Sequence, residues 1–217
     1  MFIGHAAVAL AAKPLAPRIN LGLALVAVFW VDLVWPLFLL LGIEQVRIDP
    51  GNTAFTPLDF VHYPWTHSLV AALVWSALFS LLFIQKGRTE ALILGALVFS
   101  HWILDFVSHR PDLPLWPGGA TMLGLGLWNS VPATMIVEGA MLAAGVWLYS
   151  RNAPARDRVG SIAFWSLVGF LAIAYLANAF GPPPPNVSAI AITGLVSGPV
   201  LGLWAWWADR HRGPAIR

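Results

Sequence analysis

The sequence predicts an all-α integral membrane protein, a bundle of six transmembrane helices with a short apolar helix at its N-terminus. Three observations predict this fold class. Hydrophobic residues make up 59% of the 217 residues and charged residues only 10%, whereas ordinary soluble domains have about 25% charged residues. The mean hydropathy is +0.75. The apolar residues also gather in runs close to the ~20 residues that one membrane crossing needs, which excludes a water-soluble domain.

The elements follow in order along the chain. Residues 1–12 are apolar and precede the first cation, Lys13, which is the reverse of a signal peptide and predicts a retained short helix. Glycines recur every four residues at 194, 198 and 202 and predict close helix packing within the bundle. We expect one domain over residues 1–217, with its motifs in residues 1–145 and two further spans in residues 160–208. The six expected spans are Leu21–Ile43, Ser68–Ile84, Ala91–Val107, Ser130–Leu148, Ile162–Phe180 and Val187–Trp207.

The positions of the cations predict the orientation, because Lys and Arg near the ends of spans stay in the cytoplasm. Ten of the twelve cations fall in alternate connections or at the chain ends: Lys13, Arg18, Lys86, Arg88, Arg151, Arg156, Arg158, Arg210, Arg212 and Arg217. The other connections contain only Arg47 and Arg110. We therefore expect a multi-pass protein with a cytoplasmic C-terminus. The cations form no patch suited to nucleic acid, so no nucleic-acid partner is expected.

Ionisable side chains inside spans are costly and mark functional sites by default. Six such residues are expected at one depth in the outer half of the membrane: Asp32, His67, His101, Asp105, His109 and Glu138. His5 reaches a similar depth if residues 1–12 are helical. The chain has no cysteine, so a metal must be bound by His, Asp and Glu. We expect one or two divalent ions, with Zn²⁺ favoured and Mn²⁺ or Mg²⁺ left open.

The pattern His101-x3-Asp105-x3-His109 places three side chains on one helical face. His109 lies ~12 Å from His101 along the axis, too far to share its ion, and so suits a second metal, catalysis or the substrate. Pro111 predicts a helix end near His109, which would place this imidazole at the membrane surface. Glu138 is the candidate general base. Thr66 and Ser68 are candidate helix caps.

The donor atoms of five residues are expected to converge on one or two ions: His5, Asp32, His67, His101 and Asp105. The expected walls of this site are Trp102 and Phe106, and its opening lies between the turn at His62 and the loop at Arg110. These last two residues are candidates for binding substrate. The alternative for each polar residue is a hydrogen bond within the bundle without any chemistry. Glu44, Asp59, Asp112 and His211, in loops or the tail, are expected to have only this kind of role.

The order of the motifs resembles a known family. Gly4-His5, the Asp32 to Pro36 segment, Thr66-His67-Ser68 preceded by His62, and His101-Trp102-Ile103-Leu104-Asp105 are similar to motifs of the YdjM-like inner-membrane metal-dependent hydrolases. A more distant likeness is to the metal-site layout of zinc-dependent phospholipase C and P1-type nuclease. The resemblance implies that His5, Asp32, His67, His101 and Asp105 are metal ligands. It also implies the bacterial inner membrane as the location.

Together these observations favour a membrane-embedded metal-dependent hydrolase, with the membrane lipid as its environment and possible substrate. The expected substrate is a lipid-borne ester, most simply a phosphoester, reached from the outer leaflet. One alternative is a proton- or metal-coupled transporter that uses the same polar residues as a relay. Another is a membrane protein without catalytic activity that holds a structural metal.

Overall fold

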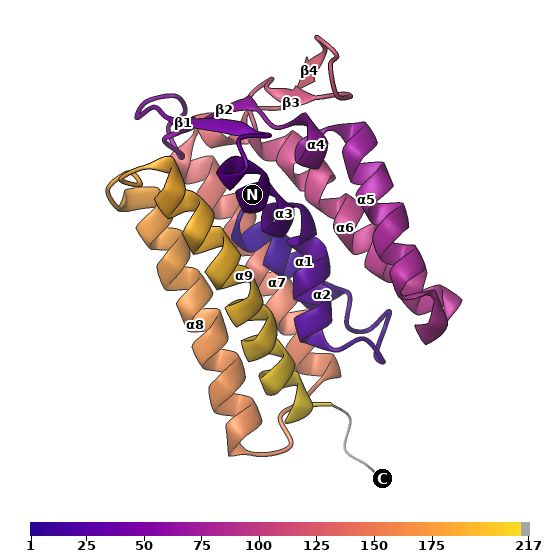
Figure 1. Ribbon diagram of the computed structural model, residues 1–217. Helices are drawn as coiled ribbons and strands as arrows, with labels where there is room; N and C mark the ends of the chain where they lie inside the picture. Colours follow the sequence, from indigo (N-terminus) through magenta and orange to yellow (C-terminus); the bar gives the residue numbers. More distant parts are fainter. Residues whose placement is uncertain (214–217) are drawn as a thin grey trace.

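The computed structural model describes residues 1–213 and is mostly helical. Two small antiparallel hairpins accompany the helices (Figure 1). The helices are α1 (Ile3–Ala11), α2 (Leu21–Val28), α3 (Trp30–Leu40), α4 (Pro64–His67), α5 (Leu69–Leu82), α6 (Arg88–Ser108), α7 (Val131–Asn152), α8 (Arg158–Phe180) and α9 (Val187–Arg210), with short 3-10 turns at Ile84–Lys86 and Leu127–Asn129. The strands are β1 (Gln45–Ile48), β2 (Leu58–His62), β3 (Leu113–Pro114) and β4 (Met122–Leu123).

Among the described residues, four helices are long and apolar enough to cross a membrane: α6, α7, α8 and α9. A fifth crossing is possible if α2 and α3, which are bent by 52° at Phe29, count as one broken span. Helix α5 has 14 residues, about 21 Å at 1.5 Å per residue, and falls short of the ~30 Å hydrocarbon core. The expected count of six spans is therefore not confirmed, whereas the short N-terminal helix is present as α1.

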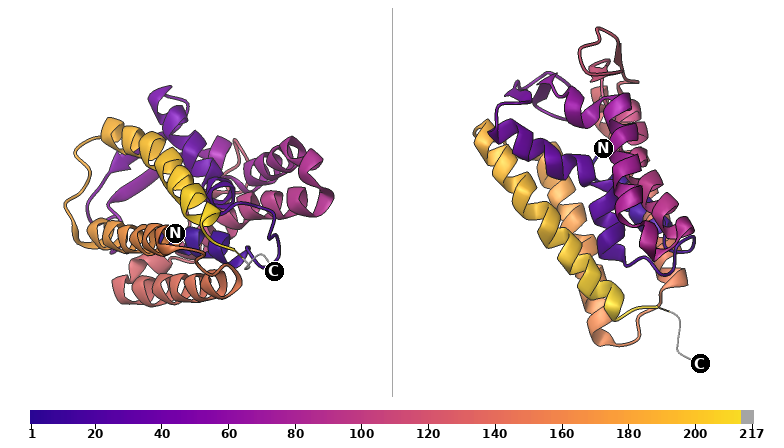
Figure 2. Two further views of the ribbon diagram at one scale, coloured as in Figure 1. Left: turned by 90° about the horizontal axis from the view of Figure 1, so that it is seen from below. Right: turned by 45° about the vertical axis from the view of Figure 1, so that its right-hand side comes forward.

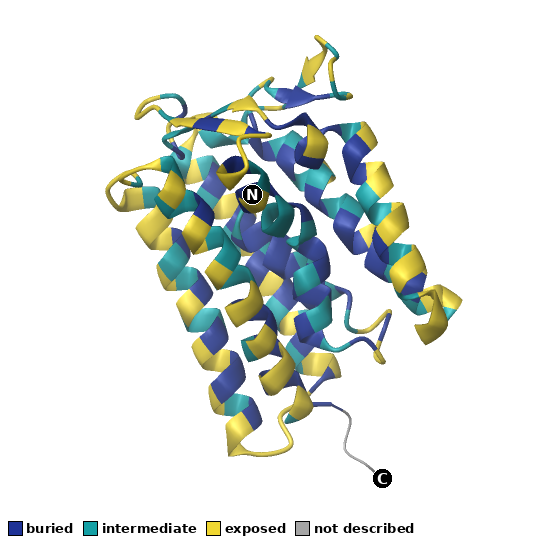
Figure 3. Ribbon diagram, in the orientation of Figure 1, coloured by how far each residue is buried: buried dark blue, intermediate teal, exposed yellow. Residues whose placement is uncertain are grey.

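Helix α1 lies at the centre of the bundle. Seven of its nine residues are buried. Figure 3 shows buried residues concentrated in α1 and the helices around it. Figure 2 shows the α5–α6 pair and α8 on opposite sides of them. A Cβ added at Gly145 of α7 would lie 2.6 Å from the carbonyl oxygen of Ala7. The glycine thus lets α7 approach the backbone of α1, which holds the short helix within the core.

The glycines of α9 pack against the broken pair α2–α3, which confirms their predicted role within the bundle. A Cβ at Gly194 would lie 2.6 Å from Pro36 Cγ, and one at Gly202 would lie 2.9 Å from Val26 Cγ2. A Cβ at Gly198 would overlap with the side chain of Leu33. Because these glycines have no side chain, α9 lies close to both α2 and α3.

The loops expected between spans contain the two hairpins. Strand β1 pairs with β2, with Gln45 opposite His62 and Ile48 opposite Leu58, and β3 pairs with β4. In Figure 1 both hairpins and the α8–α9 turn lie at one end of the molecule, and the α5–α6 and α7–α8 turns lie at the other. The cation-rich connections therefore share one end, as the alternation of charge predicts.

Candidate metal centre

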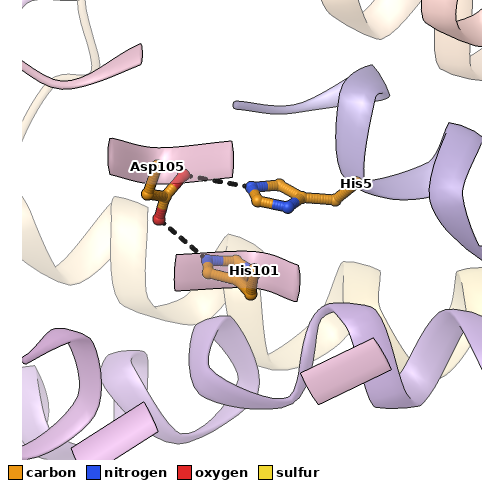
Figure 4. A group of neighbouring side chains, drawn as sticks. All are labelled: His5, His101 and Asp105. Atoms are coloured by element: carbon orange, nitrogen blue, oxygen red, sulfur yellow. Dashed lines mark hydrogen bonds and ion pairs between the residues drawn. The ribbon is translucent and has the colours of Figure 1, made fainter. Parts of the chain in front are cut away.

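Asp105 is the centre of a buried cluster in which four elements meet. His5 Nε2 lies 3.1 Å from Asp105 Oδ1, and His101 Nε2 lies 3.0 Å from Asp105 Oδ2. Figure 4 shows both imidazoles pointing at this carboxylate. His67 Nε2, from the end of α4, lies 3.9 Å from the same Oδ2. The amino group of Met1 also contacts Asp105, 2.5 Å from Oδ1.

Asp32, in the first turn of α3, closes the cluster on a second side. Its Oδ1 lies 3.3 Å from His67 Nε2 and its Oδ2 lies 3.6 Å from His101 Nε2. Two sets of three residues therefore have donor atoms within 4.8 Å of one another: His5, His101 and Asp105, and Asp32, His67 and His101. The convergence predicted from the sequence is present in the geometry. Metal binding itself stays a prediction.

The bend between α2 and α3 fixes the ring of His101. Val28 is the last residue of α2, and its carbonyl oxygen lies 2.7 Å from His101 Nδ1. A carbonyl can only accept, so Nδ1 carries the proton and donates it. The Nε2 atom then presents a lone pair to Asp105 and Asp32, which is the tautomer that a metal ligand needs.

His67 is oriented by a relay that begins at Glu44. This buried carboxylate accepts hydrogen bonds from the backbone N–H groups of Trp65 and Thr66 at 2.8 and 2.9 Å. The Thr66 hydroxyl donates to Glu44 Oε2 at 2.6 Å and lies 2.6 Å from His67 Nδ1. Because the hydroxyl proton goes to the carboxylate, Thr66 Oγ1 accepts the Nδ1 proton of His67. The Nε2 lone pair of His67 therefore faces the cluster.

His109 is held in the same manner by Asp112. Its Nδ1 lies 3.0 Å from Asp112 Oδ1, and the Tyr63 hydroxyl donates to the same oxygen at 3.0 Å. Burial, followed by the charge of Asp112, raises the pKa of Tyr63 well above its ordinary value, which keeps this phenol protonated and donating. The three residues form a buried polar group beside the cluster.

The position of His109 corrects the sequence expectation. Helix α6 ends at Ser108, as Pro111 predicts, but His109 then takes an extended conformation with φ −66° and ψ 148°. The chain turns, and the ring folds back until Nε2 lies 3.9 Å from Asp105 Oδ2. His109 is only 2% exposed. The expected surface position is therefore wrong, because a side chain on a helix leans back toward the helix N-terminus and the ring of His109 reaches Asp105 one turn earlier.

Three acidic residues that were expected only to form hydrogen bonds do form them, and their partners belong to this network. Glu44 and Asp112 orient histidines, and Asp59 binds Arg110 at 2.6 Å and Arg47 at 2.5 Å. No local sequence pattern marks these contacts, since Glu44 reaches Thr66 across 22 positions. The one available signal is the turn before α4, whose N–H groups require an acceptor. Of the two candidate caps, Ser68 caps α5 by accepting from Ala71 N–H, and Thr66 instead bridges to His67.

Glu138 is buried on α7 but contacts the backbone of α1. Its Oε2 accepts from the N–H groups of Phe2 and Gly4 at 2.9 and 3.0 Å, at the start of that helix. Among the described residues, no hydrogen bond joins it to a histidine of the cluster. Glu138 thus positions the helix that carries His5, and its role as a general base stays a prediction.

The two candidate substrate-binding residues lie apart from the cluster. The guanidinium of Arg110 is 2.6 Å from Asp59 and 3.2 Å from Asp112, so two carboxylates already neutralise it. His62 is exposed at the end of β2 and lines a separate hollow of about 170 Å³ against the β3–β4 hairpin. Substrate binding by either residue stays a prediction.

A cavity of about 210 Å³ borders the cluster on the side of Asp32, His67, Asp105 and His109. Its walls do not include Trp102 and Phe106, which stack on each other. They are chiefly Phe2, Trp35, Phe55, Leu58, Phe60 and Trp128. The opening is at Asp32, whose side chain is 38% exposed while those of the other cluster residues are 5% exposed or less.

A groove of about 300 Å³ between α3 and α9 meets this cavity. The two hollows share the residues Phe2, Asp32, Trp35 and Asn178. The rest of the groove is mostly apolar, with Leu33, Pro36, Ile190 and Leu201 among its walls. An apolar path along the bundle therefore leads to the exposed edge of a polar site.

No family model matches this chain, and neither a curated protein nor a solved structure matches it. The resemblance to the YdjM-like hydrolases remains an expectation from the motifs.

Proposed function

We propose that this chain is a membrane-embedded, metal-dependent hydrolase that acts on a lipid-borne ester, with a phosphoester as the expected bond. The observation that supports the proposal best is the arrangement of the histidines around Asp105. His67, His101 and His109 each have Nδ1 engaged by a fixed acceptor, and each has Nε2 within 4 Å of Asp105 Oδ2. Packing alone requires no such shared orientation, whereas metal ligation does.

The donor set suits a divalent ion of the zinc type. Imidazole nitrogen and carboxylate oxygen are its usual ligands when no thiolate is present, whereas Mg²⁺ prefers oxygen alone. His5, His101 and Asp105 would hold one ion, and Asp32 and His67 would extend the site toward a second. A bound ion would act as a Lewis acid on a phosphoryl or carbonyl oxygen and make a water molecule more acidic.

The partly exposed Asp32 favours catalysis over a structural metal. Structural zinc sites are closed by four protein ligands, whereas catalytic sites keep one position open. His109 then has the geometry of a general base: Asp112 holds its Nδ1 proton, and its Nε2 points toward the cavity. In this role His109 accepts a proton from the attacking water, and Asp112 stabilises the imidazolium that forms.

The groove between α3 and α9 supports a lipid as the substrate. It is apolar, lies along helices that could cross a membrane, and ends at Asp32. An acyl chain in this groove would bring the ester of the same lipid to the 210 Å³ cavity. We further propose that the protein lies in the bacterial inner membrane with its cation-rich end in the cytoplasm. The metal centre then opens to the outer leaflet.

The test uses the purified protein in nanodiscs with added Zn²⁺. Release of phosphate or of the alcohol is followed on a panel of long-chain and short-chain phosphoesters. We expect turnover of at least one long-chain substrate, lost by at least about 100-fold in His109→Ala, since general base catalysis contributes ~10²–10⁴. The control is His211→Ala, whose ring contacts Asp157 at the other end of the molecule and does not line the cavity. Zinc-bound protein with no turnover on any ester of the panel would refute the hydrolase.

A further inference from the structure

The end of the molecule opposite the metal centre contains a hollow of about 370 Å³. It lies where the loop between α1 and α2, the α7–α8 connection and the end of α9 meet. Five cations and one carboxylate line it: Lys13, Arg18, Arg156, Arg210, Arg212 and Asp209. The formal charge of the lining is thus 5 − 1 = +4. Such a surplus in a concave site attracts anions.

Two of the cations serve the fold. Lys13 Nζ lies 2.7 Å from Asp209 Oδ2, and Asp209 Oδ1 accepts from the Tyr149 hydroxyl at 2.6 Å. Arg212 is buried, donates to the carbonyl oxygens of Ala153 and Gly160, and stacks over Phe164 at 4.4 Å. These contacts engage Asp209, the one carboxylate in the pocket lining, and hold Lys13 and Arg212 in place.

The other three cations face the hollow with little neutralisation. Within residues 1–213, no carboxylate lies within 4.0 Å of Arg156 or Arg210. Arg18 reaches Glu90 only at 3.8 Å, and its side chain is 83% exposed. Arginines from three different segments therefore line one pocket. A guanidinium binds phosphate through two parallel N–H groups, which makes a phosphate group the best match for this lining.

The depth of the pocket distinguishes a lipid from a soluble anion. It lies at the end of α9, directly after the exposed indoles of Trp206 and Trp207. The Arg210 guanidinium stacks over Trp206 at 4.9 Å. Tryptophan favours the boundary between hydrocarbon and water, and basic pockets between helices at this level suit lipid head groups.

We propose that this pocket binds the phosphate group of an anionic membrane lipid. The three exposed arginines bind the phosphate, and the apolar flank of α9 accommodates the acyl chains. The site is independent of the metal centre and lies at the other end of the bundle. It gives Arg18, Arg156 and Arg210 a function beyond setting the orientation.

The test measures lipid binding to the purified full chain by native mass spectrometry, with phosphatidylglycerol as the anionic lipid and phosphatidylcholine as the zwitterionic one. The wild type should bind phosphatidylglycerol roughly 10-fold or more tightly than phosphatidylcholine. The double variant Arg156→Gln/Arg210→Gln should bind it roughly 10- to 30-fold more weakly than the wild type. The matched control is Lys86→Gln/Arg88→Gln, two cations at the same end of the molecule but outside the pocket (Figure 1). Its affinity should stay within about twofold.

Three results would overturn the proposal. The first is a wild type with no preference for the anionic lipid. The second is an equal loss in the control pair, which would make the effect one of general surface charge. The third is displacement of the lipid by millimolar inorganic phosphate, which would assign the pocket to a soluble anion. Should the double variant fail to fold, Arg18→Gln changes a side chain that is 83% exposed and tests the same pocket.

Discussion

Replacing Thr66 by Val tests the relay that orients His67. The substitution keeps the shape of the side chain and removes only the hydroxyl, which lies 2.6 Å from both Glu44 Oε2 and His67 Nδ1. Two buried polar atoms then lose a partner. At about 1–3 kcal/mol for each unsatisfied group, the free energy of unfolding should fall by about 2–6 kcal/mol.

The effect on metal affinity is separate from the effect on stability. His67 Nδ1 loses its acceptor, so the ring is free to change tautomer or rotate, and Nε2 no longer points reliably at Asp32 and Asp105. Loss of such a supporting group typically costs 10- to 100-fold in metal affinity. The assay is competition for Zn²⁺ against a chromophoric chelator, with thermal unfolding followed in parallel.

Thr66→Ser is the matched control, because it retains the hydroxyl and should bind Zn²⁺ within about threefold of the wild type. The reasoning is refuted if folded Thr66→Val binds Zn²⁺ as tightly as Thr66→Ser. In that case His67 would not depend on the relay, and the contacts of Glu44 would serve only the start of α4.

Two further predictions concern the core and the topology. Gly145→Ala places a methyl group 2.6 Å from the Ala7 carbonyl oxygen and should lower the free energy of unfolding by about 1–3 kcal/mol. The control is Gly139→Ala on the same helix, where the added methyl group meets no atom within 4 Å. This control should be neutral or stabilising by up to ~1 kcal/mol. Thermal unfolding of the pair in detergent checks this, and equal melting temperatures would contradict the close contact of α1 with α7. Single cysteines at Asn52, Gly118 and Pro184 should react with an impermeant thiol reagent from outside, and cysteines at Arg88 and Arg156 should not; the reverse pattern would invert the proposed orientation.

The polar cluster could be predicted from the sequence because its members are ionisable residues within or next to long apolar runs. His101 and Asp105 are four residues apart in an apolar run, so one helical face must hold both. His5, Asp32 and His67 share their depth, and charged groups in a membrane seek one another. The pattern does not depend on exact helix ends, so the convergence does not require the expected number of spans.

The features that were missed depend on tertiary contacts or on changes of chain direction. Residues 21–43 are almost uniformly apolar, and hydropathy does not reveal that α2 ends at Val28. The bend there frees the Val28 carbonyl for His101, which a straight span would have kept for its own helix. Glu44 lies beside Thr66 because β1, which follows Glu44, pairs with β2, which precedes α4. His109 was expected at the surface because its position was taken from the axial rise alone, whereas its ring reaches back one turn to Asp105.

The most direct test of the metal centre is the metal content of the purified protein, measured by inductively coupled plasma mass spectrometry after removal of loosely bound ions. We predict one to two equivalents of a zinc-type divalent ion per chain in the wild type. In folded Asp105→Asn and His101→Ala we predict less than about a tenth of that content, because each variant removes a donor shared by the cluster. Arg47→Gln, at the hairpin end but outside the cluster, should retain the full content. A wild type that binds no divalent ion after incubation with Zn²⁺, or an unchanged content in folded Asp105→Asn, would contradict the account.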